Sequence, residues 1–156
     1  MVKGRTDRAA YRVAAPPSTV YRALVDPSAL VQWLPPRGMT GQIDVYDPRP
    51  EGRFQMTLTY DQADAVGKTA ANRDVIEAEF VTLTPDEKIV QRVNFKSDDP
   101  QLAGNMIMSW ILRPVDNGTE VSVVCENVPA GISEHDHADG LQSSLENLAD
   151  YLSRLG

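Results

Sequence analysis

One segment determines the architecture of this chain: Glu126-Asn-Val-Pro-Ala-Gly-Ile-Ser-Glu-His-Asp-His-Ala-Asp-Gly-Leu-Gln-Ser-Ser-Leu-Glu-Asn-Leu-Ala-Asp-Tyr-Leu152. A Pro-Ala-Gly turn at 129–131 ends a strand-like run, and Ser133 is a suitable N-cap for a helix that continues toward the C-terminus. Asp136, three residues later, makes an imperfect capping box, and the acidic first turn suits the positive end of the helix dipole. The segment therefore predicts a strand, a turn and one long helix.

The predicted helix has an uneven apolar face. At about 100° per residue, one stripe is formed by Leu141, Leu145, Leu148, Leu152 and Leu155. His137 lies one turn before this stripe and, with Ser144, on the same face, while Gly140 keeps the helix surface low beside them. A helix packed by leucines at one end and carrying small or polar residues at the other would leave a cavity against a sheet.

Strand patterns precede this helix. Alternation of apolar and polar residues predicts strands over 9–13, 43–46, 54–60, 75–83, 89–95, 106–112 and 119–125. Two short helices follow the first strand, because Pro17 and Pro27 suit first helical positions and Asp26 can cap the second helix. Residues 61–71 are small and polar, which predicts a loop. We expect one α+β domain over residues 1–156, since no linker or repeat divides the chain.

Composition indicates the kind of protein and the cellular compartment to expect. The chain has 156 residues and 42 % apolar content, enough for a core, and no window of roughly 20 apolar residues that would span a bilayer. The N-terminus shows no apolar signal region, and the one cysteine, Cys125, cannot form an intramolecular disulfide. We therefore expect a cytoplasmic protein without membrane insertion.

Charge and motifs exclude several function classes. The net charge is −7 and the basic residues are scattered, so no stripe that would follow a phosphate backbone is present and nucleic acid is not expected as a partner. Glycine-rich phosphate loops, Cys-x-x-Cys pairs and nucleophile–base motifs are absent from the sequence. No cofactor and no catalytic residue are assigned.

The run Glu134-His-Asp-His-Ala-Asp139 resembles a metal motif, because histidine and carboxylate are good ligands. His135 and His137 are two residues apart, however, and on a helix they point in different directions. The run is better interpreted as a charged, capped helix entry, and no metal site is predicted.

Several segments are characteristic in their order: Pro17-Ser-Thr-Val-Tyr-Arg-Ala-Leu24, Trp33-Leu-Pro-Pro36, Arg49-Pro-Glu-Gly-Arg-Phe54, Pro85-Asp-Glu-Lys-Ile-Val90, Met106-Ile-Met-Ser-Trp-Ile-Leu112, Gly118-Thr-Glu-Val121 and the C-terminal segment quoted above. Together they resemble the START-like, Bet v 1-like (SRPBCC) superfamily. More narrowly, they resemble its bacterial branch related to the C-terminal domain of the activator of Hsp90 ATPase. The resemblance covers nearly the whole chain.

The resemblance implies a helix-grip fold: a curved antiparallel sheet of about seven strands wrapped around the long C-terminal helix, with two short helices after the first strand. It also implies a hydrophobic cavity between sheet and helix. Members of the superfamily include lipid and plant-hormone binders, polyketide cyclases and co-chaperone domains. Related bacterial proteins often have Gly-Trp where this chain has Gly140-Leu141. The co-chaperone also carries a separate N-terminal domain, for which this chain has no room.

Two polar residues on predicted inner faces have open roles. His137 could be a buried histidine satisfied by a carbonyl or a strand side chain, a polar anchor in a pocket, or a proton carrier. Gln91 shares a strand face with apolar neighbours and must find a hydrogen bond, for which His137, Ser144 or a ligand are candidates.

We therefore predict that a small apolar or amphipathic ligand binds between the sheet and the C-terminal helix. The expected ligand-binding residues are Trp33, Met56, Tyr60, Phe80, Gln91, Met108, Trp110, Cys125, His137 and Ser144. Of these, Gln91, His137 and Ser144 would orient the ligand, and Trp33 with the 61–71 loop would flank the mouth. The alternatives are a cyclase- or hydrolase-type enzyme with His137 as proton carrier, and a protein that interacts with an Hsp90-type chaperone.

Overall fold

The computed structural model describes residues 5–35, 38–60, 73–95 and 104–155. In these ranges the elements follow the order β1 (Arg5–Val13), α1 (Pro17–Val25), α2 (Pro27–Trp33), β2 (Met39–Tyr46), β3 (Arg53–Tyr60), β4 (Arg73–Thr84), β5 (Lys88–Phe95), β6 (Gly104–Val115), β7 (Gly118–Val128) and α3 (Glu134–Leu155). The predicted order of elements is confirmed. Most strands begin earlier or end later than predicted, because backbone pairing continues beyond the apolar alternation.

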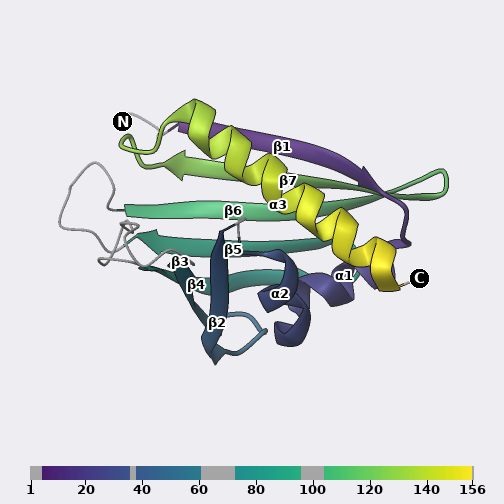
Figure 1. Ribbon diagram of the computed structural model, residues 1–156, viewed down its shortest axis with the longest axis horizontal. Helices are drawn as coiled ribbons and strands as arrows, with labels where there is room; N and C mark the ends of the chain where they lie inside the picture. Colours follow the sequence, from purple (N-terminus) through teal and green to yellow (C-terminus); the bar gives the residue numbers. More distant parts are fainter. Residues whose placement is uncertain (1–4, 36–37, 61–72, 96–103, 156) are drawn as a thin grey trace.

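The described strands form one antiparallel sheet in the order β1-β7-β6-β5-β4-β3-β2. Chain neighbours pair from β2 through β7, and the sheet is completed by β1, which pairs with β7. Helix α3 crosses one face of the sheet diagonally, beginning beside β1 and ending near α1 (Figure 1). This is the α+β arrangement that the sequence predicted.

The two short helices are fixed to each other and to the sheet. The Asp26 carboxylate caps α2 by accepting a hydrogen bond from the Ser28 backbone N–H at 2.9 Å. The Trp33 indole donates to the Ala23 carbonyl at 2.9 Å, and the Tyr46 hydroxyl of β2 donates to the Val25 carbonyl. These bonds satisfy carbonyls at the end of α1 that the helix itself cannot pair.

Helix α3 begins and packs as predicted, except at its last turn. The Ser133 hydroxyl accepts from the Asp136 backbone N–H at 3.3 Å. The first four leucines of the stripe are buried: Leu141, Leu145, Leu148 and Leu152. The expectation for Leu155 is wrong, because its side chain is 57 % exposed at the end of the helix, where no described element covers it. Among the described residues, no helix is long and apolar enough to cross a membrane.

Candidate functional site

A pocket of about 380 Å³ lies between the sheet and the helices. Its walls come from α1 and α2, from strands β3 to β6, and from the first half of α3 with the turn before it. The lining residues are Leu24, Leu30, Trp33, Leu34, Phe54, Leu58, Val75, Ile76, Ala78, Ile89, Gln91, Val93, Met106, Met108, Trp110, Ile132, Asp136, His137 and Gly140. Apart from three polar side chains and the glycine, this lining is apolar.

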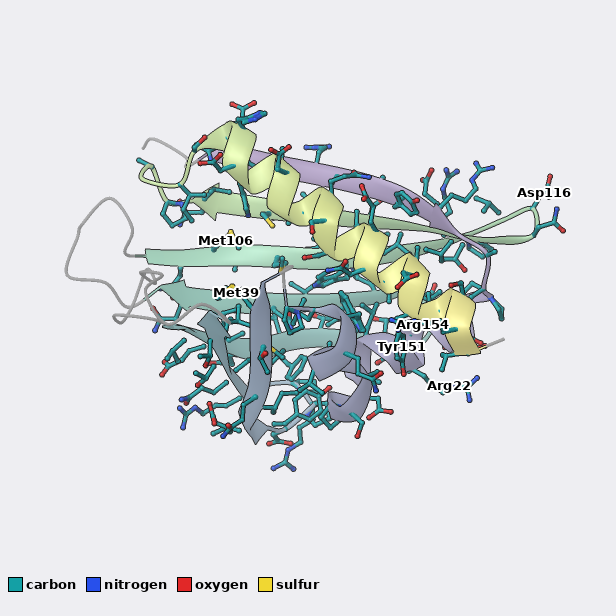
Figure 2. All side chains as sticks on the ribbon, in the orientation of Figure 1. Arg22, Met39, Met106, Asp116, Tyr151 and Arg154 are labelled. Atoms are coloured by element: carbon teal, nitrogen blue, oxygen red, sulfur yellow. The ribbon has the colours of Figure 1, made fainter. Side chains whose placement is uncertain are left out.

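The pocket lies toward the start of α3. Figure 2 places Met106 at the start of β6, at the end of the molecule where α3 begins, and Tyr151 and Arg154 at the opposite end. A Cβ atom added to Gly140 would meet no atom within 4 Å. The space around Gly140 is therefore open, and this residue lies in the pocket lining.

Two tryptophans form part of the apolar wall. The rings of Trp33 on α2 and Trp110 on β6 meet edge to face, with centroids 5.6 Å apart and an angle of 83° between their planes. Both side chains are buried, at 1 % and 5 % exposure. Trp33 therefore belongs to the wall and not to the mouth, where the sequence placed it. They are the two tryptophans of the chain, so indole signals report on this pocket.

A polar network joins β1 to the start of α3. The Asp7 carboxylate lies 2.6 Å from Nδ1 of His137. The same carboxylate accepts two bonds from the Arg5 guanidinium at 2.8 Å. Arg5 also donates to the Ile132 carbonyl at 2.7 Å, in the turn that leads into α3. The network therefore fixes the entry of α3 against β1, beside the pocket.

The backbone is irregular where β1 presents these two residues. The register of β1 against β7 shifts between Arg5 and Asp7, so β7 carries an extra residue there. Asn127 in that stretch has φ of 60°, in the left-handed region that asparagine tolerates. Its side-chain amide donates to the Asn105 carbonyl of β6 at 2.7 Å. A bulge of this kind redirects side chains and is frequent beside functional sites.

The Asp7 carboxyl is buried yet ionised. The hydrogen bond from Arg5 lowers its pKa most, burial opposes this, and the bond to His137 adds to the lowering. An ionised carboxylate only accepts hydrogen bonds, so Nδ1 of His137 must carry the proton in this pair. His137 lines the pocket with 14 % of its side chain exposed, and no described residue is bonded to its second nitrogen.

Gln91 is the polar residue of the sheet wall. It is 9 % exposed and lies on β5 between the inward-facing Ile89 and Val93. Among the described residues, its side-chain amide has no hydrogen-bond partner. Because no buried polar side-chain atom of the described residues is left unpaired, the Gln91 amide is accessible at the pocket surface, where it can bond to a molecule in the pocket.

Five of the residues predicted from sequence lie together in the pocket lining: Trp33, Gln91, Met108, Trp110 and His137. Others lie on the same faces but outside this lining. Met56 is fully buried beneath Gly41, Phe80 stacks on Phe54, and Ser144 is half-buried on α3. The Tyr60 side chain and the 61–71 loop lie outside the described residues.

Cys125 also lies outside the lining. It is fully buried on β7 opposite Asp7, and burial, with a smaller contribution from the Asp7 charge, raises the pKa of its thiol to about 12. Such a thiol stays protonated and is a poor nucleophile.

The two histidines of the helix entry point in different directions, as expected from their spacing. His135 is 84 % exposed and lies 3.3 Å from Asp139 one turn later, whereas His137 turns inward to Asp7. The run that resembles a metal motif is thus divided between a solvated face and the polar network.

Sequence reasoning missed Arg5 and Asp7. The available signal was the alternation of Ala9, Tyr11 and Val13, which places Asp7 on the same inward face when it is extended back by two residues. The strand predicted over 9–13 began after both residues.

The sheet, the long covering helix and the apolar pocket between them define an α+β protein of the helix-grip class. Residues 14–153 match the family described as "Activator of Hsp90 ATPase homolog 1-like protein". The chain belongs to this family, within the SRPBCC, Bet v 1-like superfamily. No curated protein matches the sequence.

Solved structures of several bacterial proteins share the fold. A crystal structure of a protein from Chromobacterium violaceum is 31 % identical, with a TM-score of 0.83 over 94 % of this chain and 96 % of that one. A protein from Mesorhizobium loti is 19 % identical, with a TM-score of 0.76 over 97 % of this chain and 99 % of that one. The AHSA1-like protein from Aeromonas hydrophila is 13 % identical, with a TM-score of 0.77 over 97 % and 94 % of the two chains.

Proposed function

We propose that this protein binds a small apolar or amphipathic molecule in the pocket beneath the first half of α3. The observation that carries the proposal is an apolar pocket of about 380 Å³ whose lining includes the Gln91 amide, a polar group without a described partner. Ligand sites in proteins are typically apolar pockets of roughly 300–1,000 Å³ with a few convergent polar groups. Small-ligand binding is also typical of SRPBCC domains.

The shape of the lining favours an adaptable site. Met106 and Met108 on β6 are flexible and polarisable, and methionine is frequent where a surface must fit several ligands. The paired indoles of Trp33 and Trp110 add a rigid aromatic edge for a planar molecule.

Native mass spectrometry of freshly purified protein tests the proposal. We expect a co-purifying small molecule on the wild-type protein and its loss in Val93→Phe, which fills the pocket from β5. The matched control is Ile111→Phe on β6, where the side chain is 39 % exposed and does not line the pocket. Equal binding by the Val93→Phe and Ile111→Phe variants would contradict the location of the site.

A second candidate is proton transfer by His137, favoured by the 2.6 Å contact with the Asp7 carboxylate. A carboxylate that holds a histidine by Nδ1 is the arrangement by which general bases are oriented and their imidazolium stabilised. A cyclase or hydrolase of this kind should turn over activated aryl esters or reactive polyketide mimics. Full turnover in His137→Gln, which cannot carry the proton, would argue against this role.

A chaperone-interacting role remains a prediction of the family resemblance. It is tested by a pull-down of the Hsp90 homologue from the native cell with the full chain, and no retention would argue against it.

A further inference from the structure

The tautomer of His137 determines what the pocket offers to a ligand. Asp7 is ionised and accepts from Arg5 and from Nδ1 of His137. Because Nδ1 holds the proton, a neutral ring leaves Nε2 with a lone pair. Among the described residues, Nε2 of His137 has no hydrogen-bond partner. In its neutral form, the imidazole therefore presents a hydrogen-bond acceptor where it lines the pocket.

The other charged groups near this end of the pocket also favour a ligand that donates a hydrogen bond. Asp136 also lines the pocket, with an exposed carboxylate, and Glu134 lies close enough to act on the Arg5 charge. The positive charge of Arg5 is already used by Asp7 and the Ile132 carbonyl. On β7 the facing group is the protonated thiol of Cys125.

We infer that the pocket selects uncharged apolar molecules that carry a hydroxyl or a similar hydrogen-bond donor, which donates to Nε2 of His137. This inference rests on the proposed ligand-binding function and specifies its ligand class. An anionic ligand is disfavoured at the same position, because it would meet the Asp136 carboxylate and a ring without a donor. The Gln91 amide, which both donates and accepts, serves a second polar group on the opposite wall.

Calorimetric titration with three matched probes at about pH 8 tests the inference. The probes are 2-naphthol, its methyl ether and 2-naphthoate, which share one ring system and differ in the polar group. We expect the wild-type protein to bind 2-naphthol about tenfold more tightly than the ether, the effect of one hydrogen bond of about 1.4 kcal/mol. We expect 2-naphthoate to bind more weakly than both.

Two variants distinguish loss of the hydrogen-bond acceptor from loss of the folded structure. His137→Leu removes Nε2 and leaves Asp7 paired with Arg5, so we expect it to retain ether binding within about threefold and to lose the preference for naphthol. Asp7→Asn can turn its amide N–H₂ toward Nδ1, which moves the ring proton to Nε2 and should shift the preference toward the ether acceptor. Thermal unfolding followed by circular dichroism checks that both variants are folded.

Nitrogen NMR of the imidazoles gives an independent readout. The chain has two histidines, and the exposed His135 is an internal reference for the ring of His137. We expect the Nδ1–H tautomer at His137 in the wild-type protein and the Nε2–H tautomer in Asp7→Asn. Equal binding of naphthol and ether to the wild-type protein, or an Nε2–H tautomer there, would overturn the inference and leave ligand binding standing. Binding of none of the three probes would overturn both.

Discussion

The two halves of α3 are built differently. In the second half, Leu145 and Leu148 are fully buried and Leu152 nearly so, while the Asn147 amide donates to the Pro35 carbonyl after α2 at 3.4 Å. In the first half, Gly140 meets nothing that a Cβ would touch, and the helix is held by the bond from His137 to Asp7. Apolar packing fixes one end, and a polar network beside a pocket fixes the other.

The comparison indicates that one half of α3 mainly stabilises the fold, whereas the other half forms the pocket. Close packing of leucines contributes most of the free energy that holds α3 to the sheet, because each buried leucine contributes about 2–3 kcal/mol relative to exposure. The first half keeps one buried leucine, Leu141, and otherwise gives up such packing to leave space, with a polar group on each wall. Proteins commonly accept a less stable site in exchange for binding.

The largest expected effect lies in the leucine-packed half. Leu148→Ala removes a side chain with 0 % exposure and should cost about 3–4 kcal/mol of unfolding free energy, since a cavity remains in a packed core. Urea denaturation measures the loss. The matched control is Leu155→Ala on the same helix, which is 57 % exposed and should change stability by less than about 0.5 kcal/mol. Equal losses would contradict the assigned packing.

The next effect lies in the polar network. Asp7→Ala leaves His137 without its partner and releases the Arg5 guanidinium, so we expect a loss of about 2 kcal/mol. Hydrogen exchange should show increased opening of residues 133–140 and little change around Leu148. Uniform loosening along the whole of α3 would show that the network does not act on one end alone.

Low pH should remove the contribution of the ionised Asp7 carboxylate to the stability of the wild-type protein. The pKa of Asp7 is lowered in the folded state, so its stabilisation is present above the ordinary value of 3.8 and is lost as pH falls through the lowered value. The stability difference between wild type and Asp7→Ala should therefore shrink below about pH 4. A difference that stays constant down to pH 2 would contradict an ionised Asp7.

A smaller effect, of opposite sign, is expected at the pocket wall. Gln91→Met replaces an amide that faces the apolar pocket without a described partner by an apolar side chain of similar length, and should raise stability by about 1 kcal/mol. Thermal unfolding measures the gain, and calorimetry should show weaker ligand selection. A clear destabilisation would mean that the Gln91 amide is already paired in the free protein.

The smallest effect is expected at Gly140. Gly140→Ala should stabilise α3 by about 0.5–1 kcal/mol, because alanine favours the helix and its Cβ has open space. Urea denaturation checks the sign. A loss of stability would show that the helix lies closer to the sheet at this point than the structure indicates.

Much of the fold was predictable because periodicity and caps are local. The cap at Asp26, the start of α3 at Ser133 and the inward face of the leucine stripe are each specified by a few neighbouring residues. The prediction that Leu155 is buried was wrong, because a helical stripe shows which side of the helix faces the sheet but not how far along the helix the sheet extends.

The site was only partly predictable for the same reason. Alternation placed Met56, Phe80 and Gln91 on inward faces but could not tell which part of each strand lies beneath the start of α3. Asp7 and His137 are 130 residues apart and meet because β1 pairs with β7 at the edge of the sheet. No local pattern specifies such a contact.

The most direct test of the pocket is a two-dimensional NMR titration of the full chain with 2-naphthol. Binding beneath the first half of α3 should shift the indole signals of Trp33 and Trp110 and the amide of Gly140, while the amides of Leu148 and Leu152 stay in place. Shifts confined to the outer face of the sheet, around Val81 and Ile111, or no shifts at saturating probe, would contradict it.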